Sequence, residues 1–305
     1  MNKAYLFYLL RRGIIGGRGS SPWVQIVNDF ETRVIADGGT LEAKACLNTD
    51  VQFLTENPVA PAFTGLLNDY SGAAAAYSLR LLDNTYTGDA IRVRRSSDNA
   101  EQNIGFLNNE LDTASLETFC SGTDGFVAIW YDQSGNAVNA ANATAGNQPQ
   151  IVSSGTSLGY IQNLTTTSNQ RLQSVFSYSA GNAFSSFIVS QNFGTAVIGG
   201  TVTSAYYYAV SQSGSSSNAQ SSFNAAYYNN GSSIGTTRND IHNATTSFGE
   251  LTTLGTLTSG STENATLGYS SSGFNLLRLK EYIIYDNQTI SRTGVEDNII
   301  THYGF

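Results

Sequence analysis

The chain has 305 residues, of which 40% are hydrophobic, 11% aromatic and only 12% charged. This apolar content excludes a disordered chain, and the abundance of Gly, Ser, Thr, Asn and Tyr is typical of a β protein with many turns. The formal net charge of −8 argues against nucleic acid as the main partner, because neutralising phosphates requires a basic surface.

Residues 1–22 are predicted to form an extended basic arm. Its cations are Lys3, Arg11, Arg12 and Arg18. No acidic residue occurs within 1–28, so the rest of the chain carries 11 basic and 23 acidic residues, a net charge of −12. This asymmetry favours docking of the arm onto an acidic surface, with a solvated tail as the alternative. The apolar stretch 4–10 is short and is followed by arginines, so we expect neither a signal peptide nor a membrane span.

Residues 23–62 are predicted to form a small helical attachment module and a linker. Thr40 follows an Asp-Gly-Gly corner and can cap a helix over about 41–54. Two prolines, Pro58 and Pro61, then mark the linker. Cys46 and Cys120 are interpreted as two buried thiols, with one disulfide between them as the alternative.

The next elements are predicted from local patterns. A helix is expected over 73–82, and a shorter one over 113–119 with Asp112 as its N-cap. The segment 90–95 alternates between apolar and basic residues. In a strand, this alternation places Ile91 and Val93 inward and Arg92 and Arg94 outward.

The run FVAIWYDQSGN (126–136) predicts a buried strand that ends in a polar turn. Asp132, Ser134 and Asn136 can bond nearby backbone, and Gly135 can adopt a positive φ. We interpret Asp132 as a turn cap rather than as a catalytic acid.

From residue 151 onward, short β-type segments alternate with Ser/Gly/Asn loops, which indicates a sandwich or a barrel. Candidate strands are 185–190, 195–198, 205–210, 222–228, 266–269 and 281–285. A final helix is expected after Ser291, with Val295 and Ile299 on its apolar side and Gly304 after its last residue. This helix should pack against the strands.

Several motifs together resemble the first half of the catalytic domain of fungal-type α-L-arabinofuranosidase B. They are YSLR (77–80), YTG (86–88), IRVRRSSD (91–98), IG (104–105), FCSG (119–122) and YDQSG (131–135). The endings EYIIYD (281–286) and HYGF (302–305) resemble the last strand and helix of laminin-G-like domains. The resemblance implies a mainly β fold, a concanavalin-A-like antiparallel β-sandwich (jelly roll), over 63–305. The small helical module and the arm would precede it, and the C-terminal helix would close it.

The segment RVIADGGTLEA (33–43) resembles a short module of tailed-bacteriophage structural proteins. This resemblance implies a virion protein that is anchored through its arm and displays a lectin-like domain.

The chain departs from the arabinofuranosidase pattern in two respects. Cys120 lacks the second cysteine that follows nearby in that family, and no segment matches the family's nucleophile or acid. The acids between 150 and 285 are Asp240, Glu250, Glu263 and Glu281. None of them lies in a recognisable motif, so the sequence argues against the paired carboxyl groups of a glycosidase.

Other candidate sites have ordinary structural interpretations. The isolated His242 and His302 predict no metal site and no catalytic triad. The tyrosines at 206–208 and 227–228 could stack on sugars or anchor an interface, but sandwich packing is the simpler explanation.

The sequence therefore predicts a non-catalytic structural protein of a phage virion. It would lie on the particle exterior as a homo-oligomer, bound to other virion proteins through the arm. Binding of host-surface glycans is possible; no cofactor, metal or nucleic acid is expected. The alternatives are a glycoside hydrolase of arabinofuranosidase type and a bacterial surface lectin.

Overall fold

The computed structural model describes residues 63–163, 170–178, 181–192, 196–201, 207–220, 223–258, 263–269, 277–287 and 289–305. The chain divides into two units, Met1–Ala62 and Phe63–Phe305. The predicted arm, attachment module and Cys46 lie outside the described residues and stay predictions. Within the described part, no helix has the length and apolar character needed to cross a membrane.

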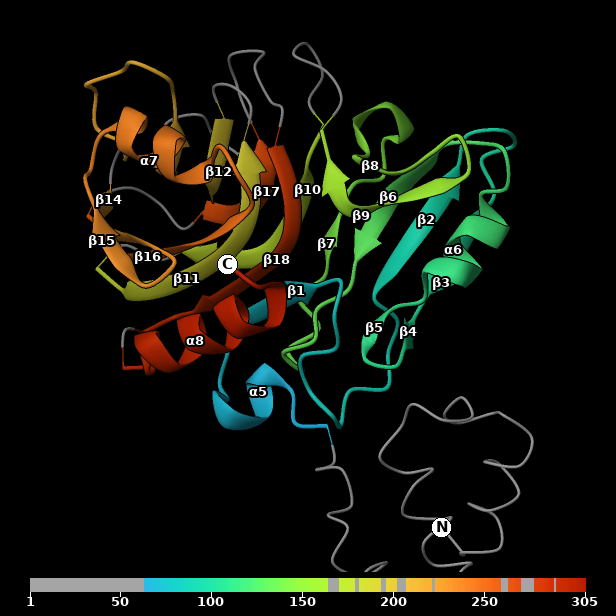
Figure 1. Cartoon of the computed structure of the whole chain (residues 1–305), viewed down its shortest axis with the longest axis horizontal. Helices are drawn as coiled ribbons and strands as arrows, with labels where there is room; N and C mark the ends of the chain where they lie inside the picture. The colour runs from blue at the N-terminus through green and yellow to red at the C-terminus, as the bar shows by residue number, and fades with distance from the viewer. Residues whose placement is uncertain are drawn as a thin grey trace, which may run out of the picture. The chain divides into compact units, whose positions relative to one another are not determined.

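The unit Phe63–Phe305 is built on antiparallel strands (Figure 1). In its first half these are β1 (Ala75–Ser78), β2 (Ile91–Arg95), β3 (Glu101–Ile104), β4 (Phe106–Leu107), β5 (Glu110–Leu111), β6 (Gly125–Trp130), β7 (Ala140–Ala141), β8 (Gln150–Ser153) and β9 (Thr156–Gln162). The second half adds β10 (Leu172–Tyr178), β11 (Ala183–Asn192), β12 (Ala196–Thr201), β13 (Tyr207–Ser211), β14 (Phe223–Asn229), β15 (Ser232–Ile234), β16 (Gly249–Leu257), β17 (Glu263–Tyr269) and β18 (Leu277–Tyr285). The described helices are α5 (Leu66–Asp69), α6 (Thr113–Phe119), η1 (Ala145–Asn147), α7 (Arg238–Thr245) and α8 (Arg292–Tyr303).

In the described part of the chain, sixteen strands form one hydrogen-bonded sheet, and β4 and β5 form a separate pair. The order of the sheet is β13-β12-β17-β10-β7-β6-β8-β9-β18-β11-β16-β14-β15, with β1 paired to β18 and the β2–β3 pair joined to β6. The pairings are antiparallel, and β8 and β9 connect the layer around β6 to the layer around β18. The predicted antiparallel β-sandwich is therefore confirmed.

The last four residues of strand β18, Tyr282–Tyr285, are apolar on both faces because both faces are covered there. Tyr282 and Ile284 belong to the central core between the layers. Ile283 and Tyr285 point the other way, into a second cluster formed with α5 and α8. Figure 1 shows these two helices next to each other beside β11 and β18. Because side chains alternate along a strand, a continuous apolar run is what a strand buried on both faces requires.

The two predicted helices with clear end signals are confirmed. Helix α6 spans the predicted residues, and the Asp112 carboxylate accepts a hydrogen bond from the amide of Ser115 at 3.0 Å. Helix α8 begins after Ser291, although that hydroxyl makes no capping bond, and it ends at Gly304 with φ of 76°. The left-handed conformation of Gly304 suits a residue without a Cβ atom.

The helix predicted over 73–82 is wrong, because this segment contains β1. The four residues of β1 are fully buried and pair with residues 281–284 of β18. An alanine-rich segment has helical propensity, but here pairing with a strand far along the chain outweighs that weak local preference.

The outward position predicted for Arg94 does not leave it exposed. Ile91 and Val93 are buried as expected, and the shift in register between Arg92 and Val93 skips a residue of β6, so the alternation along β2 continues. Arg94 is only 9% exposed. Its guanidinium donates to Gln148 at 2.7 Å and lies over the ring of Phe126, which compensates for its burial.

Candidate functional site

The corner after β6 is held by Asp132, which is 4% exposed. One carboxylate oxygen accepts from the amides of Ala76 and Ser134 at 2.8 and 3.0 Å. The other accepts from the Ser134 hydroxyl at 2.7 Å and from the amide of Val138 at 3.1 Å. The predicted capping role is confirmed, and it extends to the backbone of β1. All four donors belong to the framework, so Asp132 presents no oxygen to a substrate.

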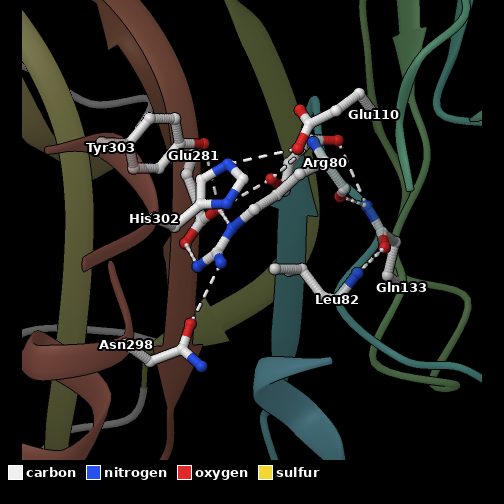
Figure 2. Close-up of polar contacts among 9 residues, drawn as sticks. Arg80, Leu82, Glu110, Gln133, Glu281, Asn298, His302 and Tyr303 are labelled. Atoms are coloured by element: carbon white, nitrogen blue, oxygen red, sulfur yellow. Dashed lines mark hydrogen bonds and ion pairs between the residues drawn. The ribbon is translucent and has the colours of Figure 1, made fainter. Parts of the chain in front are cut away.

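The next residue, Gln133, ties the segment that follows β1. Its side-chain oxygen accepts from the amide of Leu82 at 2.8 Å, and its nitrogen donates to the carbonyls of Ser78 and Arg80 at 3.1 and 3.0 Å. Figure 2 shows these contacts beside the side chain of Arg80. The corner therefore fixes the backbone from which Arg80 projects.

Arg80 meets Glu281 of β18 in a buried bidentate ion pair (Figure 2). Its Nε and Nη2 atoms donate to the two carboxylate oxygens at 2.7 and 2.9 Å. The Ser78 hydroxyl donates to Glu281 at 2.7 Å, the Tyr303 hydroxyl donates at 3.2 Å, and Arg80 Nη1 donates to Asn298 at 3.0 Å. Burial alone would raise the pKa of Glu281, but Arg80 and Ser78 outweigh it and hold that pKa below its usual value.

A pocket of about 380 Å³ lies beside this ion pair. Its lining combines the end of β1, the β4–β5 hairpin, the first turn of α6, β9, β18 and the end of α8. The lining residues are Leu79, Arg80, Glu110, Leu111, Thr113, Gly159, Lys280, His302 and Tyr303. A volume of this order is typical of small-molecule sites, and the mixture of apolar and convergent polar groups is typical as well.

Glu110, His302 and Lys280 share this pocket with the ion pair. Glu110 lies 3.4 Å from His302 Nε2 and has a side chain 57% exposed. Partial burial and the negative charge of Glu281 raise the pKa of Glu110 against the opposing effect of Arg80. Burial, followed by the charge of Arg80, lowers the pKa of His302. Burial also lowers the pKa of Lys280. The pocket therefore holds a carboxyl that keeps its proton to higher pH than usual and an imidazole that favours its neutral form.

A second group of buried acids lies where α8 contacts β16, away from the pocket lining. Glu250 and Glu296 are each at most 1% exposed, and Arg292 pairs with Glu296. One carboxylate oxygen of each acid has no partner among the described groups. Burial, together with the charge of Glu296, raises the pKa of Glu250 to about 8. Glu250 is thus protonated at neutral pH and is enclosed by the fold.

The remaining sequence candidates have structural roles. Asp240 completes the capping box of α7 with Thr237. His242 lies 3.2 Å from the hydroxyl of Ser211. Tyr227 is buried and donates to Gln220 at 2.6 Å, which agrees with sandwich packing.

Other candidates cannot be placed in a site. Tyr206 and the arm cations Lys3, Arg11, Arg12 and Arg18 lie outside the described residues, as do the side chains of Tyr207, Tyr208 and Glu263. Cys120 is a buried free thiol. No cluster of three or more His, Cys, Asp or Glu side chains suited to a metal occurs in the described part of the chain.

The sequence interpretation missed the pocket and its residues Arg80, Glu110 and Lys280. The sequence did contain one signal for Lys280. Arg278 and Lys280 alternate with apolar residues along β18, so both cations are expected to face away from the core. The convergence of β5, β18 and α8 on one pocket has no local sequence signal.

Comparisons with known proteins give one consistent result. A family model described as "Alpha-L-arabinofuranosidase B, catalytic" matches residues 69–262. A probable α-L-arabinofuranosidase B of Aspergillus terreus is 37% identical over 75 residues, which is 24% of this chain and 15% of the relative. The chain thus matches only a small part of the length of that relative.

The fold also resembles a solved structure. It is a mutant GH54 α-L-arabinofuranosidase that was soaked with 4-nitrophenyl α-L-arabinofuranoside. The TM-score is 0.51 at 15% sequence identity, over 75% of this chain and 62% of that chain. At this identity the likeness concerns the fold, and the chain spans less than two thirds of that enzyme.

Proposed function

The chain belongs to the family of α-L-arabinofuranosidase B catalytic domains, and we propose that its sandwich is a glycoside hydrolase that releases L-arabinofuranose from glycans. The observation that carries this proposal is the family match over residues 69–262, which extends across most of the sandwich. The similar proteins are both described as α-L-arabinofuranosidases.

The prediction of a non-catalytic virion protein is wrong in its function. It depended on the missing cysteine partner of Cys120 and on the absence of matching carboxylate motifs. The family match spans Cys120 and reaches beyond Glu250, so these local departures do not remove the chain from a family of catalytic domains. These comparisons give the phage setting no support. Binding to partners through the arm and a location on a particle are separate predictions that no described residue tests.

The pocket beside Arg80 supports the proposal chemically. Glycoside hydrolysis uses a proton donor with a raised pKa together with a carboxylate that stays ionised. In this pocket the pKa of Glu110 is raised, which suits the proton donor. We assign Glu110 as the general acid, because its side chain is accessible and lines the pocket.

Glu281 has a different role in this proposal. It is completely enclosed and its carboxylate is bonded to Arg80, Ser78 and Tyr303, so it acts as a positioning residue for Arg80. Among the described lining residues, Glu110 is the one carboxylate with an exposed side chain. The second carboxyl group of the reaction therefore lies outside this lining.

The test is hydrolysis of 4-nitrophenyl α-L-arabinofuranoside and release of arabinose from an arabinose-substituted polysaccharide. We expect the purified full chain to release both products. The variant Glu110→Gln should lose at least about 100-fold in kcat, the usual contribution of a general acid. Glu101→Gln on the exposed face of β3 is the matched control.

Two outcomes would count against these assignments. Absence of hydrolysis on both substrates would overturn the proposed function. Full activity of Glu110→Gln would place the reaction outside this pocket while leaving the function intact.

A further inference from the structure

Lys280 lines the pocket and forms no ion pair with any described carboxylate. Its Nζ lies 4.6 Å from the ring centre of Phe248 and 5.5 Å from that of Tyr303. Within the described residues, no carboxylate lies within ion-pair distance of Nζ and no group accepts a hydrogen bond from it. Two aromatic rings therefore position the ammonium group, and its three N–H donors remain available to a ligand.

A second cation continues this arrangement along β18. Arg278 lies two positions before Lys280 and thus on the same side of the strand. Its guanidinium is 4.6 Å from the ring centre of Tyr160, and it donates to Gln191 at 3.1 Å. The rings of Tyr160 and Phe248 are 5.6 Å apart, so one aromatic pair supports both cations. Such support reduces the side-chain entropy that is lost when a ligand binds.

The other charged groups nearby have different direct partners. Arg80 and Glu281 satisfy each other in the buried pair. Glu110 lies 3.4 Å from His302 Nε2, and it acts on Lys280 only through its charge at longer range, without an ion-pair contact. A half-buried ammonium group beside apolar Leu79 and Leu111 is costly to leave without a compensating anion.

We propose that the pocket recognises the carboxylate of a uronic acid within the glycan substrate, and that the ammonium group of Lys280 binds this carboxylate. This inference rests on the proposed function, since it takes the ligand to be a glycan. The volume of about 380 Å³ suits a sugar-sized ligand. The protein would thus discriminate between acidic and neutral glycans.

The test is isothermal titration of the full-length chain at 4 °C with two matched ligands. One is a xylo-oligosaccharide that carries a single glucuronic acid, and the other is the same molecule after reduction of its carboxyl group to an alcohol. We expect the acidic ligand to bind at least tenfold more tightly, and we expect this preference to weaken with added salt. Lys280→Met should remove the preference, whereas Lys280→Arg should retain most of it. Arg92→Met, on the distant strand β2, is the matched control.

Equal affinity of the wild type for the two ligands would overturn the inference, and so would an unchanged preference in Lys280→Met. The comparison on the wild type does not depend on how any variant folds. Hydrolysis of the neutral aryl arabinofuranoside is measured separately. If the protein hydrolyses the aryl arabinofuranoside but binds both oligosaccharides equally, the uronic-acid site is rejected and the proposed activity stands. If it binds the acidic oligosaccharide more tightly but hydrolyses nothing, the proposed activity is rejected.

Discussion

Arg80 and Glu281 are separated by 201 positions in the chain, yet they are joined by two parallel hydrogen bonds of 2.7 and 2.9 Å in the interior of the fold. The pair connects the end of β1 to β18, and Asn298 and Tyr303 of α8 bond to the same pair. The Asp132 and Gln133 corner fixes β1 from the other side. One hydrogen-bonded network therefore positions Arg80 and Tyr303, which line the pocket.

Replacing one partner of this pair should destabilise the protein strongly. Glu281→Gln leaves the buried Arg80 without its counterion, and we expect a loss of about 3–5 kcal/mol in the free energy of unfolding. The double variant Arg80→Met, Glu281→Met should recover much of that loss, because it leaves no buried charge unpaired. Urea denaturation measures all three proteins. If Glu281→Gln is as stable as the wild type, the ion pair does not stabilise the fold as proposed.

The same pair predicts sensitivity to acid. Because the pKa of Glu281 is lower in the folded chain than in the unfolded chain, its stabilisation is complete above the unfolded value of about 4.3. It is lost as the pH falls below that value toward the folded pKa. Thermal unfolding between pH 7 and 3 should show this loss in the wild type and a shallower one in Glu281→Gln. Parallel curves for the two proteins would reject the assignment.

Glu250 should make the protein less stable as the pH rises. Its pKa is about 8 in the folded chain, whereas it ionises at about 4.3 when unfolded, so the folded state holds an extra proton between these values. Within this window its contribution to stability decreases by about 1.4 kcal/mol per pH unit. Glu250→Gln, which keeps the shape of the protonated acid, should remove that slope. The measurement is urea denaturation from pH 5 to 8, with Glu101→Gln as control. A slope that persists in Glu250→Gln would contradict the prediction.

Two substitutions at Asp132 should reduce the stability of the protein by different amounts. The Asp132 carboxylate accepts four hydrogen bonds from residues of the framework. Asp132→Ala leaves buried donors unpaired and should cost about 3–5 kcal/mol of stability. Asp132→Asn retains one accepting oxygen and should cost about half as much. Chemical denaturation distinguishes the two, and equal losses in both variants would show that the individual bonds do not set the stability.

Glu110 should set the alkaline side of the pH profile of hydrolysis. A general acid must be protonated, so kcat/KM should fall as the pH rises through the raised pKa of Glu110. In Glu110→Gln the residual rate should lack this alkaline decline. Steady-state kinetics between pH 4 and 9 measure both profiles. An alkaline limb that persists in the variant would assign the acid to another residue.

Local signals explain the successful sequence predictions. Asp112 predicts the start of α6 because its carboxylate accepts a hydrogen bond from the amide of Ser115, three residues later. This capping bond needs no partner from elsewhere in the fold. Gly304 similarly predicts the end of α8. The apolar run ending at Trp130 predicts a buried strand, and the turn chemistry of Asp132 follows from its nearest neighbours. These features depend on residues within a few positions of one another.

The failures occurred where a distant partner decides the outcome. Residues 73–82 have helical composition, but the residues at their centre form strand β1 because they pair with β18. Arg94 follows the outward pattern, but its contacts with Gln148 and with the ring of Phe126 bury it. Glu281 lies in no catalytic motif, and only its contact with Arg80 reveals its environment.

The sequence by itself determined the sandwich class, the family resemblance and the capped helices, because periodicity and capping act over short distances along the chain. Only the tertiary structure decided which charges are buried together, which cation lines the pocket without an ion-pair contact, and which carboxyl groups have a raised pKa. The physical reason is that a pKa and an ion pair depend on burial and on groups brought together from distant strands. Arg80, Glu110, Lys280 and Glu281 become a site only when β1, β5 and β18 meet.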